Sequence, residues 1–146
     1  MKISPEFLMI QEVSSAVIHE KDVEELLNKV LCILAQRMGM MRGTFTLLFG
    51  DTLTIEASHG IEARRQKLGQ YRMGEGITGM VAENGKRCIV PDLRKDARFL
   101  NRTGSHIYPY QVAFICVPLI QHNKVIGTLS IDTESDRKSG SAGMPR

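Results

Sequence analysis

Several features are missing from this 146-residue sequence, and each absence argues against a class of protein. No apolar run approaches the roughly 18 to 20 residues that a membrane-spanning helix needs, and residues 1–5 form no signal-peptide core. The 19 Lys and Arg residues are scattered among 16 Asp and Glu residues rather than gathered into a tract that follows phosphates. We therefore expect a cytoplasmic protein with no membrane partner and no direct nucleic-acid partner.

Cysteine is also scarce. Cys32, Cys88 and Cys116 lie far apart, with no Cys-x-x-Cys pair and no His at metal-ligand spacing. No Gly-x-x-x-x-Gly-Lys-Ser/Thr phosphate loop is present. We expect no metal and no cofactor. Because free Cys is among the most buried residue types, we interpret the three cysteines as reduced thiols of the core.

Length and composition are those of one folded domain. Hydrophobic residues make up 42% of the chain and charged residues 24%, which is ordinary globular usage. The last residues are rich in Ser, Gly and charge, a composition typical of disorder. We predict one folded domain over residues 1–133 and a disordered polar tail over residues 134–146.

Two helices are predicted in the first third of the chain. Ser4 and Pro5 are typical of an N-cap followed by a first helical residue, for a helix to about residue 19. Asp22 and Glu25 have capping-box spacing before a run with helical apolar periodicity, which Gly39 ends. These amphipathic helices could cover one side of a sheet or pair with a second copy of the chain.

The rest of the chain indicates β-structure. Hairpins are predicted from residues 44–49 with 53–58 and from 112–120 with 125–132, and a short strand over 87–90. A short helix is expected at 80–84, and residues 93–111 form a long loop that could include one helical turn. The element order predicts an α+β domain with an antiparallel sheet covered by helices.

Three motifs in this order resemble the GAF family. They are Gly74-Glu75-Gly76-Ile77-Thr78-Gly79, Ile89-Val90-Pro91-Asp92, and the paired strands Ile115-Cys116-Val117-Pro118-Leu119 and Val125-Ile126-Gly127-Thr128-Leu129-Ser130-Ile131-Asp132. The resemblance covers residues 6–132. It implies a central antiparallel sheet with helices packed on one face and a loop-covered ligand pocket on the other.

A closer resemblance is carried by residues 71–79, 98–104 and 114–119. These stretches are similar to the amino-terminal domain of nitrogen-fixation (NifA-type) transcriptional activators, which work with the sigma-54 form of RNA polymerase. The resemblance implies a regulatory domain that senses a metabolite, with 2-oxoglutarate as a candidate, and it allows a regulatory protein partner. The chain departs from the family after its last strand, where a polar tail replaces the usual final helix.

Arginines in the long loop are the first candidates for ligand binding. Arg94, Arg98 and Arg102 recur every four residues, so a helical turn would place them on one face, where guanidinium groups could bind a dicarboxylate. The alternative is a solvated basic face paired with Asp92 and Asp96.

The remaining candidates come from three segments. Gly76 and Thr78 begin a helix whose backbone N–H groups could bind an anion, although the glycines could serve only a tight turn. Phe114 and Cys116 share one face of a strand, which either lines the pocket or packs in the core. Phe99 and Tyr110 are candidate pocket walls, with core packing as the alternative for Phe99.

Two other functions remain open. One GAF branch reduces free methionine sulfoxide with pocket cysteines, but its His-Ile-Ala-Cys-Asp-like segment is replaced here by residues 108–113, so we expect no enzyme activity. The other is a ligand-free dimerisation or partner-docking module, supported by the apolar face of the first helix. We expect a homodimer in either case.

Overall fold

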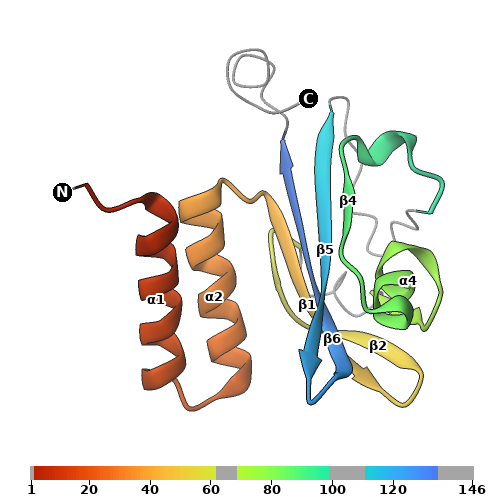
Figure 1. The fold of residues 1–146 in the computed structure, drawn as a ribbon, viewed down its shortest axis with the longest axis horizontal. Helices are drawn as coiled ribbons and strands as arrows, with labels where there is room; N and C mark the ends of the chain where they lie inside the picture. The colour runs from red at the N-terminus through yellow and green to blue at the C-terminus, as the bar shows by residue number, and fades with distance from the viewer. Residues whose placement is uncertain (1, 62–68, 99–110, 135–146) are drawn as a thin grey trace.

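The structure is a computed structural model that describes residues 2–61, 69–98 and 111–134. Helices α1 (Pro5–His19) and α2 (Val23–Met38) lie on one side of an antiparallel sheet, and α4 (Gly76–Asn84) lies on the other (Figure 1). On the first side, α1 packs outside α2, and α2 packs on β1 and β2. The predicted α+β class with a central antiparallel sheet is confirmed.

Local capping sets the starts of α1 and α2, as predicted. The Ser4 side chain accepts a hydrogen bond from the Phe7 N–H at 3.1 Å, and Asp22 Oδ1 accepts one from the Glu25 N–H at 3.2 Å. The predicted start of α4 at residue 80 is wrong, because the helix begins at Gly76. Gly74 and Glu75 form the turn, but residues 76–79 of the glycine-rich stretch are already helical, and Ile77 is buried in the cluster beneath the helix.

The sheet has the strand order β3-β2-β1-β6-β5-β4 in the described part of the chain. Its strands are β1 (Arg42–Phe49), β2 (Thr52–His59), β3 (Gln70–Arg72), β4 (Cys88–Val90), β5 (Val112–Gln121) and β6 (Lys124–Glu134). The last strand, β6, lies between β1 and β5 and so joins the two hairpins. Strand β3 was not predicted, because its sequence is polar and short and its pairing with β2 is not local.

Each face of the sheet has its own apolar cluster. The cluster beneath α2 consists of Leu31, Leu34, Met40, Phe45, Ala57 and Ile131. The cluster beneath α4 consists of Ile77, Val81, Val90, Leu93, Phe114 and Cys116. Side chains alternate along a strand, so Leu119 of β5 packs toward α2, whereas Phe114 and Cys116 face α4. This assigns the two faces of β5, which the sequence left open.

The prediction that all three cysteines lie in the core is wrong for Cys32. Cys116 is buried and Cys88 is half-buried, but Cys32 is exposed on α2. Its neighbours Leu31 and Leu34 turn toward the sheet, and the helical period of 3.6 residues then points position 32 outward. Within the ranges described, no helix is long and apolar enough to cross a membrane.

Strands β1 and β6 approach each other closely at Gly127. A Cβ atom at this position would lie 2.0 Å from the Thr46 carbonyl oxygen, far inside van der Waals contact. The obstacle is backbone, which no side-chain rotation can move. Position 127 therefore requires glycine for the central strand pair to form.

Gly127→Ala should lower the free energy of unfolding by about 1–3 kcal/mol or more, because the backbones of β1 and β6 must separate. The measurement is urea denaturation of the purified chain. Gly43→Ala is the matched control in β1, since its Cβ would meet the flexible Met40 side chain. If both substitutions lowered the free energy of unfolding by the same amount, this account would be contradicted.

Candidate functional site

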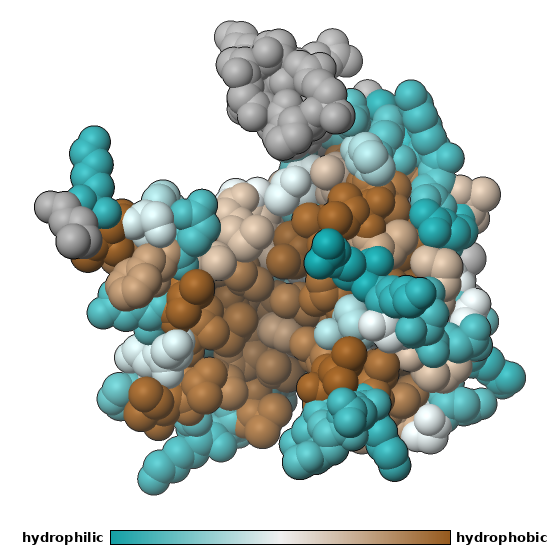
Figure 2. All heavy atoms as spheres, viewed as in Figure 1, coloured by the Kyte–Doolittle hydropathy of each residue, from teal (hydrophilic) through white to brown (hydrophobic). Residues whose placement is uncertain are grey.

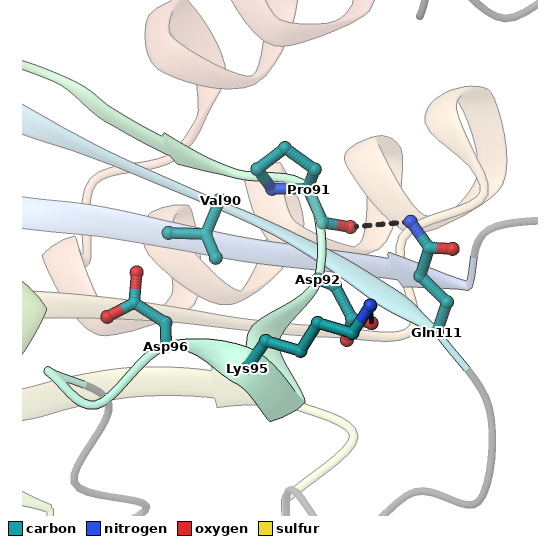
Figure 3. Close-up of a pocket in the computed structure, with 6 residues that line it drawn as sticks. All are labelled: Val90, Pro91, Asp92, Lys95, Asp96 and Gln111. Atoms are coloured by element: carbon teal, nitrogen blue, oxygen red, sulfur yellow. Dashed lines mark hydrogen bonds and ion pairs between the residues drawn. The ribbon is translucent and has the colours of Figure 1, made fainter.

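A hollow lies where β4 ends and β5 begins, on the α4 side of the sheet. Its volume is about 420 Å³, and it is lined by Val90, Pro91, Asp92, Lys95, Asp96 and Gln111 (Figure 3). Gln111 Nε2 donates to the Pro91 carbonyl oxygen at 3.1 Å and so joins the two strand ends. The 3₁₀ helix η1 (Leu93–Lys95) forms one side, and Leu93 anchors it in the apolar cluster beneath α4.

Asp92 organises the start of η1. Its Oδ1 accepts hydrogen bonds from the Arg94 backbone N–H and from Arg94 Nε, both at 3.1 Å. Arg94 Nη2 donates to Asp92 Oδ2 at 3.0 Å, which completes a two-pronged ion pair. The Arg94 hydrogen bond lowers the pKa of the Asp92 carboxyl, which favours its ionised form.

Asp96 repeats the same arrangement four residues later. Its Oδ1 accepts from the Arg98 backbone N–H at 2.8 Å and from Arg98 Nε at 2.9 Å, and its Oδ2 accepts from Nη2 at 2.5 Å. Hydrogen bonding to Arg98 lowers the pKa of Asp96. Segment 92–98 thus consists of two Asp-x-Arg units, each closed by its own ion pair.

The expected helical placement of Arg94 and Arg98 on one face is wrong. Helix η1 ends at Lys95, and Asp96 has an extended backbone. The physical reason is that each Asp side chain bonds the backbone N–H two residues later, which competes with continued helical bonding. Both arginines instead form ion pairs, Arg94 with Asp92 and Arg98 with Asp96, which was the alternative expected from the sequence.

The charges remain accessible to solvent. The exposed fractions of the Arg94 and Arg98 side chains are 39% and 47%, and that of Lys95 is 81%. Figure 3 shows Lys95 extending past Asp92, and its Nζ lies 3.9 Å from Asp92 Oδ2. Both guanidinium groups are accessible to an incoming anion, whereas the side chains of Asp92 and Asp96, which hold them, are only 11% and 14% exposed.

The other predicted residues are divided between the core and undescribed segments. Phe114 and Cys116 belong to the cluster beneath α4, and Thr78 is buried, with its side chain hydrogen-bonded to Cys116. Gly76 is the first residue of α4. The remaining three, Phe99, Arg102 and Tyr110, lie outside the described residues. None of the six described candidates lines the hollow. Arg94 and Arg98 form ion pairs with Asp92 and Asp96, which do line it.

Gly74, before α4, and Gly79, within its first turn, support a tight turn into the helix. The Gly74 N–H donates to the Gly79 carbonyl oxygen at 2.8 Å. A Cβ at Gly79 would lie 2.2 Å from the Arg72 carbonyl oxygen, so the close backbone contact requires glycine. The backbone contacts of this turn therefore explain why glycine stands at positions 74 and 79.

A row of buried polar side chains on β6 also faces α4, and sequence reasoning missed it. Thr128, Ser130 and Asp132 alternate with apolar residues, a pattern that could have revealed the row. Thr128 Oγ1 lies 2.6 Å from Oγ1 of buried Thr46, Ser130 Oγ donates to Cys116 Sγ at 3.4 Å, and Asp132 Oδ1 accepts from a β1 N–H at 2.7 Å. The floor of this face is therefore polar along β6 and apolar along β4 and β5.

Two hollow-lining residues, Lys95 and Gln111, were also missed. The signal that could have found this region is the repeated Asp-x-Arg spacing of residues 92–98, which places carboxylates as well as cations at the strand end. In the described segments, no group of three or more His, Cys, Asp or Glu residues is placed to hold a metal ion. The geometry is that of a charged, accessible surface.

Comparison with known proteins places this geometry in a family. The chain is 34% identical over 134 residues to the Nif-specific regulatory protein of Azospirillum lipoferum, a match that covers 90% of this chain and 22% of that protein. The chain spans about a quarter of the length of the curated relatives it matches. The resemblance to nitrogen-fixation regulators is confirmed as sequence similarity.

Solved structures show the same fold. The GAF domain of A. aeolicus nlh2, in an inactive state, has a TM-score of 0.83 and 28% identity, over 94% of this chain and 85% of that chain. Free methionine-R-sulfoxide reductase from Neisseria meningitidis, in complex with its substrate, has a TM-score of 0.73 at 18% identity, over 97% and 85%, which shows a shared fold alone. The family model for the GAF domain matches residues 22–141. The chain belongs to the GAF domain family.

Proposed function

We propose that this chain is the metabolite-sensing regulatory domain of a cytoplasmic, sigma-54-dependent activator of nitrogen-fixation genes and has no enzyme activity of its own. The candidate ligand is 2-oxoglutarate or a similar dicarboxylate. The similarity to Nif-specific regulators supports the regulatory role. The observation that carries the ligand class is the pair of Asp-x-Arg units beside the hollow.

The chemistry of these units suits a dicarboxylate. A guanidinium group binds a carboxylate through two parallel charge-assisted hydrogen bonds, and Asp92 and Asp96 occupy such positions in the structure. A ligand with two carboxylates could replace both Asp side chains, while Lys95 and Gln111 offer further donors. Arg102, which lies outside the described residues, remains a candidate for the same role.

Such exchange would act by a population shift. Ligand would favour the arrangement of segment 92–98 in which the guanidinium groups face the hollow, and it would disfavour the present Asp pairs. The segment is joined to β4, and β4 pairs with β5, which pairs with β6. A change at η1 could thus reach β1 and the α2 side of the sheet through directly paired strands.

Calorimetric titration of the purified chain with 2-oxoglutarate tests the ligand. We expect saturable binding that Arg94→Ala or Arg98→Ala weakens by about tenfold or more, because each removes charge-assisted hydrogen bonds to a carboxylate. Arg37→Ala is the matched control, since Arg37 also forms an exposed ion pair, with Glu12 between α2 and α1. Absence of binding to the intact chain, or equal losses in all three variants, would overturn the proposed ligand.

A second function, docking of another copy of the chain, is favoured by the surface of α1. Phe7, Ile10, Val17 and Ile18 are 55–77% exposed and recur with helical spacing on one side of the helix. The sequence left open whether this face packs on the chain's own sheet; in the structure α1 packs on α2 instead. Figure 2 shows apolar surface that continues from these helices over the adjoining face of the sheet.

Phe7→Glu combined with Ile10→Glu should convert a dimer to a monomer, because charges at an apolar helix interface must lose their hydration. Light scattering after size-exclusion chromatography, over a range of concentrations, measures the mass. Phe49→Glu is the matched control, since Phe49 is 59% exposed at the end of β1, away from α1. A monomeric parent chain, or a dimer that survives the double substitution, would rule out this interface.

A further inference from the structure

Two cysteines on adjacent strands lie directly opposite each other. The β4–β5 register pairs Cys88 with Cys116. Directly opposed residues of antiparallel strands have Cα atoms about 4.5 or 5.5 Å apart, and both separations fall within the range of about 4.4–6.8 Å found in disulfides. Opposed residues also share a face, and Cys88 packs against the apolar cluster that contains Cys116. The backbone is therefore already positioned for a bond between the two sulfur atoms.

The two thiols differ in access. Cys116 is fully buried, and its burial raises the pKa of the thiol to about 11 despite hydrogen bonds from Ser130 and Thr128. Cys88 is half-buried near the sheet edge, in the last strand of the described sheet order. A small oxidant would reach Cys88 first, and Cys116 lies behind it as the only sulfur directly across the strand pair.

Arg98 places positive charge beside Cys88. Hydrogen bonding to Asp96 is the main cause that raises the pKa of Arg98, and its contact with the Cys88 sulfur adds to the effect. Nη1 of the same guanidinium group lies 3.8 Å from Sδ of Met80, a residue of α4.

We propose that Cys88 and Cys116 form an oxidation site for hydrogen peroxide, which closes to a disulfide between β4 and β5. The Cys88 sulfur attacks one peroxide oxygen and the O–O bond breaks, which leaves a sulfenic acid and releases water. The Cys116 sulfur then attacks the Cys88 sulfur and the S–O bond breaks. A second water leaves with the Cys116 proton. The two thiols lose two electrons, and the peroxide gains them.

Formation of the disulfide would also affect segment 92–98. Strand β4 leads within two residues to Asp92, so a bond at Cys88 would fix the start of segment 92–98 to β5. Arg98 would also lose its thiol partner. The proposal rests on strand register and cysteine placement, so its test does not depend on whether the proposed ligand binds.

The test uses the 146-residue chain with Cys32→Ser, which leaves the two opposed thiols. After treatment with hydrogen peroxide, remaining thiols are alkylated and the digested chain is analysed by mass spectrometry. We expect both thiols to disappear with one time course, a linked peptide that joins residues 88 and 116, and full recovery of both thiols with dithiothreitol. The parent chain should show the same link, with Cys32 alkylated or oxidised separately.

Single cysteine variants separate the role of Cys88, which reacts with peroxide, from that of Cys116, which then forms the disulfide. With Cys116→Ser added, Cys88 should still react but proceed to sulfinic acid or to a link between chains. With Cys88→Ser added, buried Cys116 should react at least about tenfold more slowly than in the pair. Circular dichroism checks that each variant is folded. Two thiols that stay alkylatable after peroxide, or sulfinic acid at Cys88 beside a free Cys116 in the two-thiol chain, would overturn the proposal.

Discussion

The placement of β6 between β1 and β5 is the constraint on which the rest of the structure depends. The last described strand joins the two halves of the chain into one sheet, and it can do so only because Gly127 allows β1 to approach. Next to this contact, the hydroxyls of Thr46 and Thr128 meet at 2.6 Å, and Thr46 Oγ1 also accepts the Thr128 backbone N–H at 3.2 Å. Buried hydroxyls are costly unless bonded, so this pair also favours one register of the strands.

Once the sheet is closed in this order, its faces acquire different roles. One face packs an apolar cluster beneath α2, and α1 adds an outer layer with an exposed apolar side. The other packs α4 over β5 and β6 and leaves the ends of β4 and β5 to the charged segment 92–98. Strand β5 contributes to both, since Leu119 packs toward α2 whereas Phe114 and Cys116 pack toward α4. This division places accessible charge on one side and accessible apolar surface on the other.

Features set by neighbouring residues could be predicted from the sequence, and features set across the sheet could not. The caps at Ser4 and Asp22 and the hairpin around Gly50 depend on residues within a few positions, so their patterns were sufficient. The Thr46–Thr128 bond spans 82 positions, and the β2–β3 pairing has no apolar pattern to reveal it. In the site, the arginines were found from their spacing. Their geometry was not, because Asx hydrogen bonds from Asp92 and Asp96 replaced the expected helix.

Hydrogen exchange with and without saturating 2-oxoglutarate tests most directly whether the charged end of β4 and β5 is the sensing surface. The account predicts slower exchange in residues 88–98 and 111–114, because a bound dicarboxylate would order η1 and the strand ends, with little change in the outer helix α1. Unchanged exchange in those segments, or protection that appears only in α1, would contradict it and favour a module that docks through its helices.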